Sequence, residues 1–403
     1  MATSVYERLM LFICKEATML TTLAVPVKPT YQAPPPPRKS AEQTLDADPH
    51  GKYIYRPGEL VWFNRGTAWG LSVIAKRQIL NDKPRYLVQP LSHPYQHLPA
   101  QIKDKEDDIR PWLAWSVPNP TIAALRNLTF DTVPWDRVLR GELGNGDVQV
   151  DGSILAAKTI DGSYSLFDRL DTIAAPNEVH YNGMFLGAEK IWAGEPVRLR
   201  YPGEDLAVLI IQKMIERTSA SPPGSVVTFI GDIYKFVEMP SPYKTSAEWP
   251  TPLLPARMVA DLHYRNRVSE MAGKHIWHEW RLLEPAARRG LADIKGRWYE
   301  TEKLLPILRG TQQFEQDVRQ GIASDSGIWM NSRGDSSTGA GQRKKHRLDT
   351  FGQSVPAEFK VSRGLDGIPA DDLFPDAITT HTAPRFVEGD MDEFMNLDPP
   401  YGA

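Results

Sequence analysis

The chain has 403 residues, 24% of which are charged, and its formal net charge is −3. This balance argues against bulk electrostatic attraction to nucleic acid but is compatible with a local basic patch. A single cysteine, Cys14, excludes an internal disulfide and a thiolate zinc site. No stretch approaches the ~20 apolar residues of a membrane helix, so we expect no contact with a membrane.

The first 118 residues divide into a spacer and a β module. Residues 34–37 are four consecutive prolines, so residues 1–50 are predicted to be a disordered, proline-rich segment. Residues 51–118 have apolar, β-branched runs, and the run 86–91 is expected to pair with 71–74 across a turn. We predict an SH3-like β module there, closed by residues 110–115.

The next segment, residues 119–176, is predicted to be a structured connector. Residues 121–128 favour a helix. Residues 148–153 favour a strand that enters an Asp-Gly turn at Asp151 and Gly152.

Residues 177–310 repeat the opening of the first module. Gly58-Glu59 and Gly194-Glu195 each place a glycine turn and an acidic residue before an apolar strand. Buried strands are expected over 207–215 and 226–237, with a polar loop over 218–224. The predicted fold class is therefore mainly β with a helical annex, built from SH3-like and bromo-adjacent-homology-like barrels with disordered termini.

Four aromatic residues lie in or close to the predicted strands and are candidates for an aromatic groove. Such a groove binds a methylated lysine by cation–π attraction, whereas the alternative is that some of these rings pack in the core. The four are Trp62, Trp69, Tyr86 and Trp192.

The helical annex is predicted over residues 253–308, where two helices carry apolar stripes and many arginines. Arginine and tryptophan dominate interface energetics, so this segment is the candidate partner-binding surface. The alternative is direct binding of DNA or nucleosomes by arginines between Arg265 and Arg297. The candidate partner-binding residues are Trp277, Trp280, Arg281, Arg288, Arg289 and Arg297.

No pattern of catalytic or metal-binding residues stands out. The pairs His275/His278 and His93/His97 lack a third ligand nearby, so packing or surface histidines are the simpler interpretation. No phosphate loop, dinucleotide turn or nucleophile elbow is present. We therefore expect no enzyme, no cofactor, no metal and no small-molecule substrate.

The last segment, residues 311–403, is predicted to be a disordered tail. It holds an acidic and apolar stretch at 390–397, which either folds against a partner or is inert. It also holds a basic cluster that is either a nuclear import signal or a solvated charge run. The basic cluster consists of Arg343, Lys344, Lys345 and Arg347.

Three stretches together resemble a known family: residues 183–199, 229–234 and 294–300. Their succession is similar to that of the fungal cryptic-loci-regulator transcription-silencing family, mainly over residues 179–308. The resemblance implies a nuclear, non-enzymatic scaffold or adaptor of a SHREC-type heterochromatin-silencing complex. Its implied partners are histone deacetylase and chromatin-remodeller subunits, with nucleosomes or DNA as the alternative.

Overall fold

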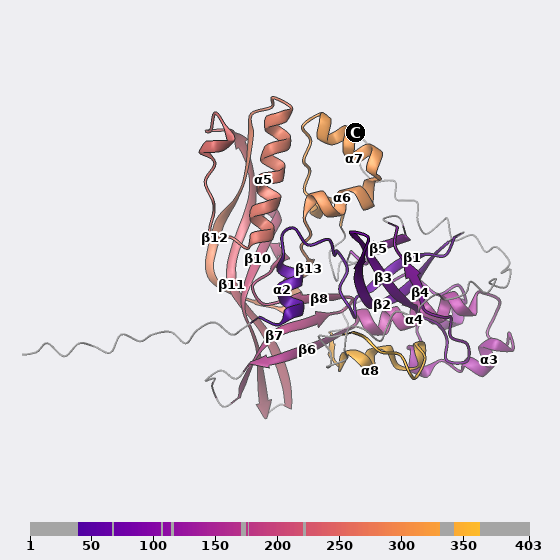
Figure 1. Cartoon of the computed structure of the whole chain (residues 1–403). Coiled ribbons are helices and arrows are strands. Elements are labelled where there is room, and N and C mark those ends of the chain that lie inside the picture. The colour runs from indigo at the N-terminus through magenta and orange to yellow at the C-terminus, as the bar shows by residue number, and fades with distance from the viewer. Residues whose placement is uncertain are drawn as a thin grey trace, which may run out of the picture. The chain divides into compact units, whose positions relative to one another are not determined.

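Two β-sheets organise the computed structural model of the chain, and strand outweighs helix as predicted (Figure 1). The model describes residues 39–362 except for Thr67, 106–107, 114–116, 171–174, 176, 221–222 and 331–341. The prediction for residues 390–397 and most of the proline-rich segment lie outside the described residues.

The first sheet has five strands in the order β4-β3-β2-β1-β5. The predicted pairing is confirmed, because Ile74 lies opposite Val88 and the turn at Asn81 and Asp82 joins β2 to β3. Pro111 lies opposite Val61, so β5 adds to β1 at one edge. The strands are β1 Leu60–Asn64, β2 Trp69–Leu80, β3 Lys83–Pro90, β4 Gln101–Lys103 and β5 Ile109–Pro111.

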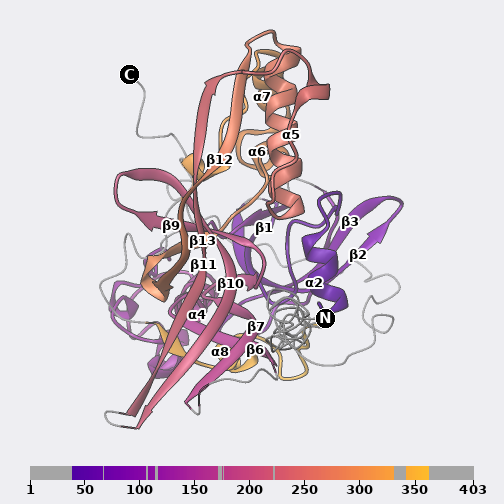
Figure 2. The same cartoon turned by 90° about the vertical axis from the view of Figure 1, so that its left-hand side faces the viewer.

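The second sheet has nine strands, of which six follow the order β12-β11-β10-β7-β6-β14, while β8 pairs with β7 and β9 pairs with β10 and β13. The strands β10 and β11 form one long hairpin, visible in Figure 2, and the register of β11 with both of its neighbours shifts at Gly231. The strands are β6 Ser163–Leu170, β7 Glu178–Leu186, β8 Glu189–Trp192, β9 Pro196–Tyr201, β10 Glu204–Ala220, β11 Pro223–Pro240, β12 Ile276–Gly290, β13 Ile294–Arg297 and β14 Arg343–Lys344.

Helices cover parts of both sheets. The helix α4 packs on β2 and on α8, and α5 lies along β12. The α-helices are α2 Ala41–Ala47, α3 Trp135–Leu139, α4 Val148–Asp161, α5 Ala256–Met271, α6 Thr301–Arg309, α7 Thr311–Arg319 and α8 Arg347–Phe351.

The strand predicted over residues 148–153 is wrong, because these residues begin helix α4. The carboxylate of Asp147 caps this helix by accepting hydrogen bonds from the backbone N–H groups of Gln149 (2.9 Å) and Val150 (3.0 Å). Gly152 marks a close approach of two backbones and not a turn. A Cβ atom on it would lie 2.5 Å from the backbone nitrogen of His93.

This contact predicts that Gly152→Ala destabilises the protein. Alanine favours a helix interior over glycine by about 1 kcal/mol, but overpacking against a backbone costs about 1–3 kcal/mol, so we expect a net loss of about 1 kcal/mol. Urea unfolding measures the change. The control is Gly290→Ala, where the nearest atom to the new Cβ is Asp293 Oδ2 at 3.8 Å. Unchanged stability of Gly152→Ala would show that α4 can shift away from the backbone of His93 without a cost in stability.

The second helix of the predicted annex is also wrong. Residues 276–290 form strand β12, which pairs with β11 from Pro240↔Ile276 to Thr228↔Gly290. Trp277 and Trp280 therefore belong to a strand, and their spacing matched a helical stripe by coincidence. The small 3-10 turn at Ala123–Leu125 likewise replaces the helix predicted over 121–128. The first helix of the annex, α5, is confirmed.

Within the described residues, β12 pairs only with β11, so its other edge has no neighbouring strand. Side chains of helix α5 bind backbone groups along that edge. The side-chain amide of Asn266 accepts a hydrogen bond from the backbone N–H of His278 (2.7 Å) and donates one to its carbonyl (3.1 Å). The backbone N–H of Ile276 donates to Ser269 Oγ (2.9 Å). These side chains satisfy backbone groups that a neighbouring strand would otherwise pair with.

Both segments predicted to be disordered contain ordered parts. Helix α2 lies within residues 1–50, and Ser40 caps it by accepting a hydrogen bond from the N–H of Gln43. Within residues 311–403, β14 pairs in parallel with β6, and Phe351, Val355 and Val361 are buried. Local composition misled the prediction, because these few apolar side chains gain stability by joining a core formed by distant residues.

The described residues contain no closed barrel, so neither the SH3-like nor the bromo-adjacent-homology-like barrel is confirmed. One core cluster combines Leu60 and Leu71 of the first sheet with Ala188, which follows β7. The boundaries predicted at 118/119 and 176/177 therefore stay predictions. Among the described helices, none has the length and apolar character needed to cross a bilayer.

Candidate functional site

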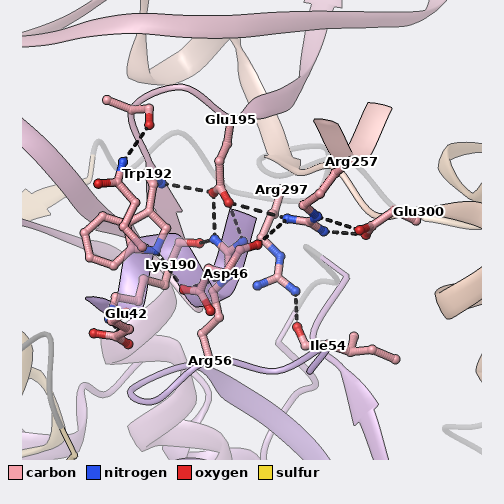
Figure 3. Close-up of polar contacts among 12 residues, drawn as sticks. Glu42, Asp46, Ile54, Arg56, Lys190, Trp192, Glu195, Arg257, Arg297 and Glu300 are labelled. Carbon is pink, nitrogen blue, oxygen red and sulfur yellow. Dashed lines mark hydrogen bonds and ion pairs between the residues drawn. The ribbon is translucent and has the colours of Figure 1, made fainter. Parts of the chain in front are cut away.

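Buried ion pairs connect the segment before β1, helix α2, the β8–β9 turn and helix α5 (Figure 3). The guanidinium of Arg56, which is 2% exposed, forms a bidentate pair with Glu195, with N–O distances of 2.7 and 2.6 Å. Its Nε lies 3.4 Å from Asp46 Oδ2. Helix α2, the segment before β1 and the distant β8–β9 turn thus meet at one guanidinium.

Two further arginines extend this ion network. Arg257 of α5 pairs with both carboxylate oxygens of Glu300, and its Nη1 lies 3.4 Å from Glu195 Oε1. Arg297 of β13 donates to Glu59 Oε1 at 2.8 Å and to the carbonyl of Ile54. Paired, multiply hydrogen-bonded charges are the form in which buried charges are tolerated.

The pKa shifts of the acids show how strongly the arginines compensate burial. Burial alone would raise the pKa of Glu300, but the Arg257 guanidinium outweighs it and lowers this pKa to about 2. Burial would likewise raise the pKa of Asp46, yet Arg56 and Arg77 hold it well below its usual range. Both carboxyls are therefore ionised at neutral pH.

A lysine occupies an aromatic enclosure next to this network. The ammonium group of Lys190 lies 4.9 Å from the ring centre of Trp192, 5.1 Å from Phe167 and 5.5 Å from Phe185. It forms an ion pair with Glu42 of α2 at 2.6 Å, and burial lowers the pKa of Lys190. Cation–π attraction is thus used inside the protein, on one of its own side chains.

The four candidate groove residues do not come together. Trp62 stacks on Trp112 at 5.6 Å, and Trp69 carries the Arg110 guanidinium 4.6 Å above its ring. Tyr86 is buried, and its hydroxyl accepts a hydrogen bond from the N–H of Ile54 (3.1 Å). Trp192 is buried beside Lys190, so the alternative of core packing holds for Tyr86 and Trp192.

The predicted partner-binding residues divide into buried and accessible ones. Trp277 packs against Tyr243 at 4.6 Å, and Trp280 packs against Phe236 at 5.2 Å; both tryptophans are buried. Arg297 belongs to the ion network. Of the six, Arg281 and Arg288 are exposed and Arg289 is half-buried in a pair with Glu284.

The arginines proposed as a nucleic-acid surface, those between Arg265 and Arg297, are partly accessible. Arg265 is fully buried between Asp261 and Asp325, with N–O distances of 2.7 Å to each. Arg297 is also buried, whereas Arg267, Arg281 and Arg288 are exposed. Binding of DNA or nucleosomes by this stripe therefore stays a prediction.

The basic cluster is only partly accessible. Arg347 is 1% exposed and donates to the carbonyls of Gly58 (2.6 Å) and Gly187 (2.6 Å), which removes it from the surface. Lys344 pairs with Glu216 at 2.6 Å, and Arg343 is exposed. A nuclear import signal that includes Lys345 stays a prediction, but Arg347 cannot contribute to it in this fold.

The histidine pairs do not form a metal site. His278 lies in β12 and bonds to Asn266, whereas His97 Nδ1 lies 3.0 Å from Ser92 Oγ. The described part of the chain has no group of three histidine, cysteine or acidic residues that could hold a metal ion.

The segment that supplies most of the ion network can be compared with known proteins. Residues 180–300 match the family model of the transcription-silencing protein Clr2. The resemblance to the Clr2 silencing family is confirmed. Lys190, Glu195 and Arg297 lie in this Clr2 segment, whereas their ion-pair partners Glu42, Arg56 and Glu59 lie outside it.

One solved structure, described as Clr2 bound to the Clr1 C-terminus, is similar to this chain with 14% sequence identity and a TM-score of 0.45. The similarity covers 80% of this chain and 63% of that one, so the present chain spans less than two thirds of its length. Among curated proteins, a search finds no match to this chain.

Proposed function

We propose that this protein is a non-enzymatic scaffold or adaptor subunit of a nuclear complex that silences heterochromatin. The match of the Clr2 segment to a transcription-silencing family carries this proposal. Its partners would be the histone deacetylase and chromatin-remodeller subunits of that complex. The buried ion network supports a scaffold role because its ion pairs hold the Clr2 segment to helix α2 and to the segment before β1.

The exposed part of β12 is the proposed contact surface. Leu282 is 48% exposed, and the exposed arginines Arg281 and Arg288 belong to the same strand. Arginine beside an apolar group is a common composition of energetically important interface positions. The buried Trp277 and Trp280 are excluded from this surface, which corrects the anchors predicted from the sequence.

A pull-down tests this proposal. The full chain carrying a tag should recover deacetylase and remodeller subunits from nuclear extract at high salt. Leu282→Asp combined with Arg288→Glu should lower their recovery at least about tenfold, the effect of ~1.4 kcal/mol at an interface. The control is Val226→Asp, which changes an exposed apolar residue on β11, at 65% exposure.

Two results would overturn the proposal. Recovery of neither class of subunit would reject the scaffold function. Recovery that the β12 variant leaves unchanged would reject the contact surface. Direct binding of DNA or nucleosomes, the alternative, would instead be lost steeply as salt rises. The burial of Arg265 and Arg297 leaves only the other arginines of that stripe to contact a phosphate.

A further inference from the structure

A surface pocket of about 380 Å³ lies outside the Clr2 segment, beside the first sheet. Ligand pockets in proteins typically measure ~300–1,000 Å³. Three distant parts of the chain line it: residues 94–97 after β3, Trp135 at the start of α3, and residues 352–357 after α8.

Three of the eight lining residues carry an aromatic ring: Tyr95, His97 and Trp135. Tyr95 is 60% exposed and so can be reached from solvent, whereas Trp135 is 6% exposed. Trp135 is held in place by Phe130, with ring centres 5.3 Å apart, and its indole N–H donates to the carbonyl of Phe130 at 3.3 Å. His97 lies beside them, and burial lowers its pKa, so that the ring is neutral at pH 7.

Carboxylates surround this aromatic lining. The hydroxyl of Tyr95 bonds to the carboxylate of Asp136, which raises the pKa of Tyr95. Glu358 is close enough to His97 to oppose the effect of burial on that ring. Asp131 Oδ1 lies 4.0 Å from the position that a Cβ atom would take on Gly352, which lines the pocket. All three acids are exposed.

Two nearby arginines, one on α3 and one directly after it, share a single carboxylate. Arg137 and Arg140 both bind Glu142, with N–O distances of 2.9 and 2.6 Å. Together these three side chains carry one net positive charge against the three acids named above, so the surroundings of the pocket favour positive charge. This local charge is the opposite of what a phosphate or a carboxylate ligand requires.

Two features restrain the backbone around the pocket. The backbone N–H of Ser92 donates to the carbonyl of Ser354 at 3.0 Å, which joins two of the three lining segments. Gly352 has φ +49° and ψ −133°, a conformation that a side chain would strain. Such fixed walls reduce the entropy cost of binding a side chain.

We propose that this pocket binds the cationic side chain of a basic peptide, namely a lysine, a methylated lysine or an arginine. Tyr95 and Trp135 would contact the apolar stem and attract the charge through their rings. Asp131, Asp136 and Glu358 would supply the long-range attraction. This pocket differs from the groove predicted from Trp62, Trp69, Tyr86 and Trp192, and it is independent of the scaffold function.

Titration of the full chain with short peptides tests the proposal. The peptides share a glycine, serine and alanine frame and carry one central lysine, trimethyllysine, arginine, acetyl-lysine or norleucine. Ligand-observed NMR gives the dissociation constants. The best cationic peptide should bind at least about tenfold more tightly than the acetyl-lysine and norleucine peptides, in keeping with cation–π energies. The ranking of the three cations then identifies the preferred side chain.

Two variants locate the site. Tyr95→Ala should weaken binding of the best peptide about tenfold, and Asp136→Asn should weaken it about threefold while reducing its sensitivity to salt. The matched controls are Leu139→Ala on the same helix, at 47% exposure, and Glu315→Gln on α7. Both controls should bind as the unmodified chain does.

Equal binding of the norleucine peptide would overturn the proposal, because the pocket would then select apolar groups. Unchanged binding by Tyr95→Ala with an unchanged melting temperature would overturn it as well. In either case the pull-down through β12 keeps its own outcome, so this failure and a failure of the scaffold function can be told apart.

Discussion

Replacing Arg56 with methionine should destabilise the protein by about 3–5 kcal/mol. The guanidinium compensates Glu195 in a bidentate pair and also lies next to Asp46, and all three side chains are buried. Methionine fills part of the volume but leaves Glu195 without its bidentate partner, and among the described residues Asp46 keeps only Arg77 as an ion-pair partner. The expected loss is a large fraction of the ~5–15 kcal/mol that stabilises a typical protein.

Urea unfolding measures this loss, and two further variants interpret it. Arg137→Met removes a guanidinium whose side chain is 54% exposed, and it should change stability by less than about 0.5 kcal/mol. Adding Glu195→Gln to Arg56→Met should restore part of the stability, because one of the stranded charges is then absent. A loss below about 1 kcal/mol for Arg56→Met would mean that solvent reaches Glu195, contrary to the structure.

The second large effect is an acid-dependent contribution from Glu300. Its pKa is about 2 in the folded protein and 4.5 as an ordinary glutamate. Because the folded value is the lower one, its stabilising contribution is complete above pH 4.5 and is lost as the pH falls toward 2. At ~1.4 kcal/mol for each pKa unit, the contribution is about 3 kcal/mol.

The variant Glu300→Gln isolates this contribution from other acids. This is necessary because burial raises the pKa of Glu42 and of Glu59, so these two carboxyls respond to pH in the opposite sense. Glu300→Gln should be about 3 kcal/mol less stable than the unmodified chain at pH 6, and the gap should close as the pH falls toward 2. Glu315→Gln removes an exposed carboxyl and should show no such closing gap. A gap that stays constant with pH would show that Glu300 is not held ionised by Arg257.

The sequence predicted much of the two sheets because their signals are local. Alternating apolar residues and the turn at Asn81 and Asp82 locate β1 to β3, and the apolar run at 207–215 locates β10. The assignment of residues 148–153 and 276–290 failed because tertiary contacts decided it. Gly152 and Trp280 are compatible with more than one local structure, and only their distant neighbours, His93 and Phe236, distinguish them.

Only two members of the ion network, Glu59 and Glu195, stood out in the sequence. The repeated glycine and acidic residue drew attention to Glu59 and Glu195, although as turn residues. The structure shows both as buried counter-ions of Arg297 and Arg56. No sequence pattern pairs residues that are 139 or 238 positions apart, and charged residues are by default expected at the surface. The pocket around Tyr95 and Trp135 was missed for the same reason.

The hydrogen bonds from Asn266 to β12 bear on how the chain folds. Before α5 packs against the sheet, His278 presents a free N–H and a free carbonyl along the open side of a hairpin, where a strand of a second molecule can attach. When α5 docks, Asn266 binds this N–H and this carbonyl, and a strand of a second molecule can no longer pair with them. We therefore expect a substitution such as Asn266→Leu to act mainly during folding. It should increase aggregation during refolding, and the aggregated fraction should rise with protein concentration.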